Sequence, residues 1–166
     1  IEQTAGLWAS SYLGLHRGVD AQTAAAFASL FYIGITVGRA ISGFITLKLN
    51  DEKMIWLGLG IIAFGIGMIL LPIGNAGALA GLIVVGLGCA PVYPCVVHST
   101  PARFGEEKSQ AIIGVQMAFA YIGTCFMPPI FGLIAEHISM GLFPFYMLVI
   151  LGFMIYMYKS VCEKTR

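Results

Sequence analysis

Two ionisable side chains, Glu2 and Arg39, lie within long apolar stretches of the sequence. A charge inside a membrane is costly, so such residues are by default either paired or functional. Counting back from Leu15 at about 1.5 Å per residue, Glu2 lies about 20 Å below one membrane surface, where it could meet a solute or take up a proton. The alternative is a structural pair with a basic residue outside this sequence. Counting from Ala21, Arg39 lies about 27 Å deep, at the far membrane edge, which favours holding or gating helix ends.

Arg39 belongs to a polar stripe on an otherwise apolar helix. The stripe recurs every three or four residues and so shares one face: Ser29, Tyr32, Thr36, Arg39 and Gly43. Such a stripe either lines a wet cavity or forms hydrogen bonds within a helix bundle, and Tyr32 is the candidate cavity residue. Gly34 and Gly38 lie on the opposite face, with a spacing that permits close helix packing.

Two later stretches carry further candidate solute contacts. Pro91 and Pro94 interrupt an apolar run and predict a bent helix with Tyr93 between them. Broken helices are a transporter feature, although a packing kink explains the same pattern. Gln116, in the next run, can both donate and accept hydrogen bonds, as a hydroxyl-rich ligand requires. Small residues seven apart also mark one face of the proline-containing run: Gly81, Gly88 and Cys95.

The composition indicates an all-α integral membrane protein. Hydrophobic residues make up 58% of the chain and charged residues 10%, with a mean hydropathy of +0.89, whereas soluble domains average about 25% charged residues. A net charge of +1 without a basic patch gives no reason to expect nucleic acid as a partner. The sequence shows no catalytic constellation and no metal-ligand spacing, so we expect no enzyme activity, no metal and no cofactor.

Charged residues and breaker clusters divide the chain into predicted membrane spans. A helix needs about 20 apolar residues to cross, and the first run is shorter, so we expect it to be the end of a helix that begins upstream in a larger protein. The predicted spans are 1–15 (partial), 21–47, 54–71, 78–97, 109–135 and 138–158, with a turn at 72–77. Spans 54–71 and 138–158 lack buried polar groups apart from tyrosines, so they are expected to face lipid.

Basic residues fall almost entirely on one side of the predicted spans. Loops 48–53 and 98–108 and the tail from 159 carry seven of them: Lys48, Lys53, Arg103, Lys108, Lys159, Lys164 and Arg166. Arg17 alone falls on the other side. Positive residues accumulate in cytoplasmic loops, which predicts a cell-membrane protein with a cytoplasmic C-terminus.

These segments together resemble a known transporter family. VGRAISGF and its short basic loop resemble the inner-loop motif of the major facilitator superfamily, with matches at Gly38, Arg39 and Gly43. The acidic residue expected early in that motif is replaced near Thr36. GLGCAPVYP resembles helix 10, and GVQMAFAYIGTCFMPPIFG helix 11, of the sugar porters near the fucose permeases. IEQTAGLWASSYL resembles the end of helix 7 in that branch.

The resemblance implies a six-helix bundle, helices 7 (partial) to 12, which is the C-terminal half of a twelve-helix carrier and needs the N-terminal six-helix half as its partner. Helices 7, 8, 10 and 11 would line a solute cavity within the lipid bilayer. Transport would follow alternating access, often coupled to protons, with Glu2 as the coupling or sugar-binding residue. The implied cavity contacts are Gln3, Trp8, Tyr32, Tyr93 and Gln116.

Some alternatives stay open. Trp8 could stack on a sugar face or anchor the chain at the membrane interface. The protein could instead export a drug or another solute with the same fold, or it could be a membrane interaction protein without transport.

Overall fold

The computed structural model describes residues 1–46, 48–71 and 74–165, and these residues form helices and turns without strands. In chain order the elements are α1 (Glu2–Leu15), α2 (Ala21–Ile45), α3 (Asp51–Leu70), α4 (Gly74–His98), α5 (Thr100–Phe104), α6 (Glu106–His137), the 3₁₀ turn η1 (Met140–Leu142) and α7 (Phe143–Lys164). The all-α prediction is therefore confirmed. Within these described residues, five helices, α2, α3, α4, α6 and α7, are long and apolar enough to cross a membrane.

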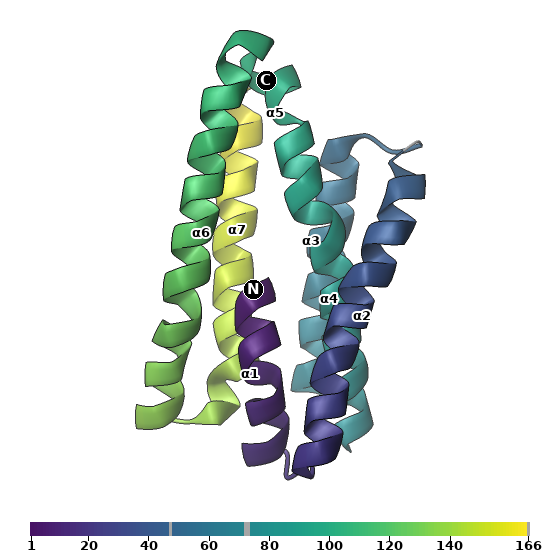
Figure 1. Cartoon of the computed structure of the whole chain (residues 1–166), viewed down its shortest axis with the longest axis vertical. Coiled ribbons are helices and arrows are strands. Elements are labelled where there is room, and N and C mark those ends of the chain that lie inside the picture. The colour runs from purple at the N-terminus through teal and green to yellow at the C-terminus, as the bar shows by residue number, and fades with distance from the viewer. Residues whose placement is uncertain (47, 72–73, 166) are drawn as a thin grey trace.

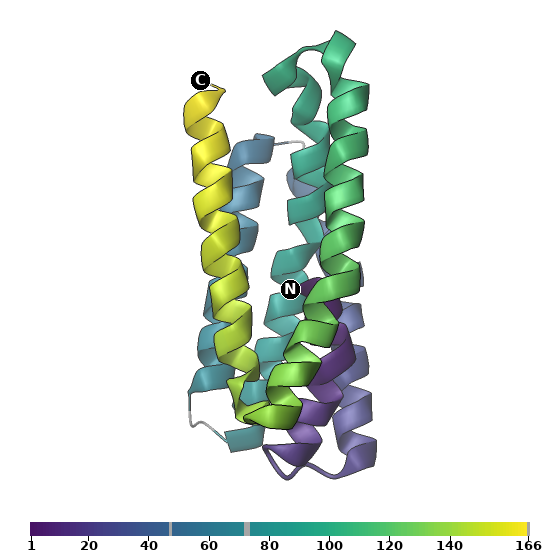
Figure 2. The same cartoon turned by 90° about the vertical axis from the view of Figure 1, so that its left-hand side faces the viewer.

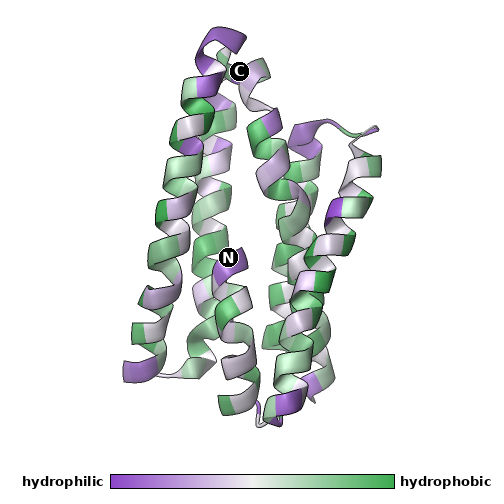
Figure 3. Ribbon diagram, viewed as in Figure 1, coloured by the Kyte–Doolittle hydropathy of each residue, from purple (hydrophilic) through white to green (hydrophobic). Residues whose placement is uncertain are grey.

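The long helices run side by side as an elongated bundle. α4 packs along both α2 and α3, while α1 connects α2 to α6, and α7 lies beside α3 (Figures 1 and 2). Hydrophilic residues gather at the two ends of the bundle, and the residues of the long helices between the ends are mainly apolar (Figure 3). The N-terminus lies about midway along the long axis, whereas the C-terminus lies at the end that carries α5 (Figure 1).

Several helix boundaries differ from the predicted spans. α3 begins at Asp51 and α6 at Glu106, because acidic residues in a first turn interact favourably with the positive end of the helix dipole. α4 begins at Gly74, so residues 74–77 of the predicted turn are helical, while residues 72 and 73 lie outside the described residues. α7 begins at Phe143 rather than 138, after a 3₁₀ turn in which the Ser139 hydroxyl accepts a hydrogen bond from the Gly141 N–H.

The span predicted for 21–47 ends at Ile45 in the structure. Residue 47 and Arg166, which counted toward the charge bias, lie outside the described residues. Between α4 and α6, the predicted polar loop contains a short helix, α5.

α4 continues as one helix through Pro91 and Pro94, where the sequence predicted a bend. Proline at 91 cannot donate to the carbonyl of Leu87, four residues earlier. Gly38 of α2 lies against that carbonyl, since a methyl group built on Gly38 would be 3.0 Å from the Leu87 oxygen. Close packing of a neighbouring helix thus covers the carbonyl, and the packing-kink alternative fits better than a broken helix.

Glycines allow α4 to approach both of its neighbours closely. Toward α2, a methyl group built on Gly34 would lie 2.6 Å from the Ile83 carbonyl oxygen, which agrees with the predicted packing face. Toward α3 the arrangement is reciprocal: a methyl on Gly58 or on Gly88 would lie 2.8 Å from the carbonyl oxygen of the other. Gly65 and Gly81 repeat this relation two turns away. A methyl on Gly65 would lie 2.8 Å from the Gly81 carbonyl oxygen, and one on Gly81 would lie 2.7 Å from the Gly65 carbonyl oxygen. We call these four residues the glycine seam: Gly58, Gly65, Gly81 and Gly88.

The turn between α1 and α2 is tied to the end of α3. The Arg17 guanidinium donates to the carbonyl of Ile69 and, at 3.1 Å, to the hydroxyl of the buried Tyr12. Asp20 caps α2 by accepting the Thr23 N–H at 2.9 Å, and this hydrogen bond holds the pKa of the Asp20 carboxyl below its usual range. Arg17 therefore caps the C-terminus of α3, where the last carbonyls have no donor within the helix.

Replacing Arg17 by methionine should destabilise the bundle by about 1–3 kcal/mol, because the Ile69 carbonyl and the Tyr12 hydroxyl would both lose their partner. Thermal unfolding of the detergent-purified protein would show this as a lower Tm. Lys164→Met removes an exposed cation at the other end of the bundle and serves as the control. Equal Tm values for the two variants would contradict the role of Arg17.

Candidate functional site

The structure pairs the two ionisable residues of the apolar stretches. Arg39 Nη2 of α2 lies 3.8 Å from Glu2 Oε1 of α1, and their side chains are 61% and 36% exposed. This corrects the expectation that depth separates the two residues, because a long arginine side chain can carry its charge several ångströms along the helix. It also gives Glu2 a basic partner within this chain. The separation exceeds hydrogen-bond length, so the contact is a loose ion pair.

The polar stripe of α2 is exposed along its whole length. All five members, Ser29, Tyr32, Thr36, Arg39 and Gly43, are exposed. The Ser29 and Thr36 hydroxyls donate to carbonyls of their own helix, at 3.0 and 2.9 Å. Among the described residues the stripe makes no hydrogen bond to another helix, although its member Arg39 forms the ion pair with Glu2 of α1.

Tyr32 reaches from this stripe across to α1. Its ring lies over Gly6, where a methyl group would overlap the tyrosine hydroxyl. Gln3 is exposed one position after Glu2 on the same helix. α1 and α2 thus carry one carboxylate, one guanidinium, one amide and one phenol, groups that can bind hydroxyls as donors and acceptors.

Tyr93 and Gln116 lie together elsewhere, at a cavity of about 630 Å³ between α4 and α6. The other lining residues are mainly apolar: Val96, Ile112, Val115 and Phe119. Gln116 Nε2 donates a hydrogen bond to the Thr100 hydroxyl at 3.1 Å. That hydroxyl in turn donates to the Val96 carbonyl at 2.9 Å. Gln116 therefore holds α6 to α5, and only part of its hydrogen-bonding capacity faces the cavity.

The predicted site residues consequently fall into two groups. Glu2, Gln3, Tyr32 and Arg39 belong to α1 and α2, whereas Tyr93 and Gln116 belong to α4 and α6. Within the part of the chain that the structure describes, no hydrogen bond or ion pair connects the two groups.

Trp8 is a packing residue in this structure. Its indole N–H donates to the Pro128 carbonyl of α6 at 3.0 Å, and its ring meets Phe131 edge-on at a centroid distance of 5.6 Å. Gly132 makes room for the ring, because a methyl group there would lie 2.8 Å from the Trp8 side chain. The polar atom of Trp8 therefore has a partner within the bundle.

The inner-loop motif residues have different surroundings. Gly38 is buried against α4, where a methyl group would lie 2.7 Å from Ala90 Cβ. Gly43 is exposed and has nothing within 4 Å of an added methyl group. Next to this motif, Asp51 Oδ2 lies 2.7 Å from His98 Nδ1, which joins the start of α3 to the end of α4. Within the described ranges, no three His, Cys, Asp or Glu side chains cluster as a metal site.

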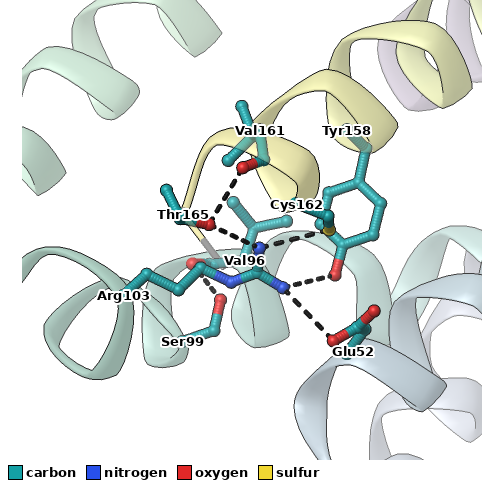
Figure 4. A network of polar contacts seen from close by, with 8 residues as sticks. All are labelled: Glu52, Val96, Ser99, Arg103, Tyr158, Val161, Cys162 and Thr165. Carbon is teal, nitrogen blue, oxygen red and sulfur yellow. Dashed lines mark hydrogen bonds and ion pairs between the residues drawn. The ribbon is translucent and has the colours of Figure 1, made fainter.

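A second polar network, which sequence reasoning missed, surrounds Arg103 of α5 (Figure 4). Its guanidinium donates to the Tyr158 hydroxyl at 3.0 Å and to Cys162 Sγ at 3.2 Å, and lies 3.9 Å from Glu52. The Arg103 side chain is only 16% exposed. It joins α3, α5 and α7, although the sequence indicated only its charge and its side of the membrane.

Comparison with known proteins identifies a family. The family model described as Major Facilitator Superfamily matches residues 3–161. Searches of curated proteins and of solved structures found no match. The matched region includes the whole of α2 to α6 and most of α1 and α7.

Proposed function

Because the chain belongs to the Major Facilitator Superfamily, whose members are membrane transporters, we propose that it forms one half of a secondary active transporter for a small polar solute, with sugars as the substrate class. The single observation that carries this proposal is the exposed polar face on α1 and α2. There, the Glu2–Arg39 pair and Tyr32 occur on otherwise apolar helices. Ionisable groups within membrane-spanning helices are costly, and they occur where they face water or a ligand.

The same proposal assigns α1, α2, α3, α4, α6 and α7 to helices 7 to 12 of a carrier near the fucose permeases, with α5 in the loop between helices 10 and 11. The N-terminal six-helix half would cover the exposed face, and the solute site would lie between the halves. Transport would proceed by alternating access in the cell membrane, with a cytoplasmic C-terminus and with Glu2 as the proton-coupling residue. Only 11% of the most apolar segment of α6 is buried within this chain, so much of the helix surface is available to such a partner.

A second candidate is an exporter of apolar or amphipathic drugs with the same fold. The cavity between α4 and α6 favours it, because Tyr93 and Gln116 are its main polar contributors and the remaining lining is apolar. A sugar would leave most of its hydroxyl groups without partners there, at an energetic cost.

The deciding experiment uses the full-length carrier in proteoliposomes. With an imposed inward proton gradient, we expect accumulation of a radiolabelled sugar from a panel of hexoses and pentoses, and no accumulation after the gradient is collapsed. Extrusion of lipophilic cations without sugar flux would favour the exporter. No flux of any tested solute, together with a stable protein partner, would favour a membrane interaction protein.

A further inference from the structure

A pocket of about 350 Å³ with four charged residues in its lining lies at the α5 end of the bundle, apart from the proposed solute face. Three helices line it, and its main side chains are Glu52, Trp56, Arg103, Lys159, Cys162 and Glu163. Glu52, Arg103 and Cys162 of the network described above (Figure 4) belong to this lining. Within the lining, two cations and two carboxylates balance in charge.

The pocket opens where two membrane-facing helices end. Below it, α3 and α7 expose large apolar side chains, with Phe64 66%, Phe153 65% and Tyr156 69% exposed. Gly60 of α3 and Gly152 of α7 are also exposed, with free space around them. Trp56, at 40% exposure, is a residue typical of the level between hydrocarbon and headgroups. A lipid whose chains lie along α3 and α7 would therefore place its headgroup at the pocket.

The charged groups of the pocket hold each other only loosely. Arg103 and Glu52 are 3.9 Å apart, and Lys159 and Glu163 are 4.0 Å apart, both beyond hydrogen-bond length. The Glu52, Lys159 and Glu163 side chains are 53%, 67% and 67% exposed. Their carboxylate oxygens and ammonium protons are thus accessible to an outside ligand that carries charges of both signs.

We propose that this pocket binds the headgroup of a phospholipid that combines a phosphate with a primary amine, such as phosphatidylethanolamine. Lys159 and the edge of Arg103 would contact the phosphate, while Glu52 and Glu163 would accept hydrogen bonds from the ammonium group. A primary ammonium has three N–H donors, whereas a choline headgroup has none. A purely anionic headgroup would be repelled by the two carboxylates of this pocket. The basic clusters that attract anionic lipids consist of lysine and arginine instead. The proposal is independent of which solute is transported.

Native mass spectrometry of the purified full-length carrier tests this site. The protein is equilibrated with an equimolar mixture of dioleoyl phosphatidylethanolamine, phosphatidylcholine and phosphatidylglycerol, and retained lipids are counted. We expect phosphatidylethanolamine to be retained at least about fivefold over each of the others, equivalent to about 1 kcal/mol. The double variant Glu52→Gln/Glu163→Gln should reduce this ratio to about one, because the amine acceptors lose their charge.

Controls separate lipid binding from folding. Arg103 is left unchanged, and Glu163→Gln alone, at an exposed side chain, should give an intermediate ratio with an unchanged Tm. Glu107→Gln alters an exposed carboxylate at the start of α6, outside the pocket, and should keep the full preference. Equal retention of the three lipids, a preference for phosphatidylglycerol, or a preference that survives the double variant would overturn the proposal.

Discussion

Gly88→Val is expected to prevent the chain from folding, whereas Gly60→Val should be tolerated. A side chain at Gly88 would begin 2.7 Å from the Ile62 backbone nitrogen and 2.8 Å from the Gly58 carbonyl oxygen. Both atoms belong to the backbone of α3 and cannot move away as a flexible side chain would. Overpacking in a core costs about 1–3 kcal/mol where side chains can adjust, so separating two helices should cost more. That loss is a large part of the usual stability of about 5–15 kcal/mol.

Gly60 provides a matched control on the partner helix. It lies two residues from the seam in α3, is exposed, and has nothing within 4 Å of an added methyl group. Fluorescence-detected size-exclusion chromatography of the tagged full-length protein measures the outcome. We expect aggregate or no protein for Gly88→Val and a monodisperse peak for Gly60→Val. A monodisperse Gly88→Val protein with the parental Tm would show that α3 and α4 do not depend on the seam.

The helix content and the small-residue face of α4 could be predicted because both are properties of one segment. Hydropathy identifies long apolar helices, and the seven-residue spacing of Gly81 and Gly88 places them on one face. The partner glycines, Gly58 and Gly65, lie in a stretch that otherwise carries only apolar residues. Their pairing depends on which helix lies opposite and in what register, and neither is encoded in the spacing of one segment.

The candidate site could be predicted only as far as residue types and depth allow. Glu2 and Arg39 are conspicuous as charges in apolar runs, but their pairing depends on side-chain reach and on the approach of α1 to α2. Trp8 is a residue type that can stack on a ligand, yet its indole N–H donates to the carbonyl of Pro128, 120 positions later. Arg103 likewise contacts Tyr158 and Cys162, 55 and 59 positions away. Contacts over such separations follow from the fold.

Glu2→Gln in the full-length carrier should reduce proton-driven uptake at least about tenfold, equivalent to about 1.4 kcal/mol or more. Glutamine keeps the shape of the side chain but cannot take up and release a proton at this position. The ion pair is loose and its side chains are partly exposed, so expression and Tm should change little. The control variant Glu136→Gln changes an exposed carboxylate near the C-terminal end of α6, and we expect its uptake to be normal. Normal uptake by Glu2→Gln would remove this residue from the mechanism.

A lost activity in Glu2→Gln could also arise because Arg39 is left without its counter-ion inside the membrane. The double variant Glu2→Gln/Arg39→Gln distinguishes the two causes, since it removes both charges together. If Glu2 carries the proton, the double variant should be as inactive in gradient-driven uptake as the single one. If Glu2 serves only to neutralise Arg39, removing the arginine should restore uptake toward the parental rate. Because the 3.8 Å contact places both residues on the exposed face, we expect the double variant to stay inactive, with Arg39 as the group that positions the proton-carrying carboxylate.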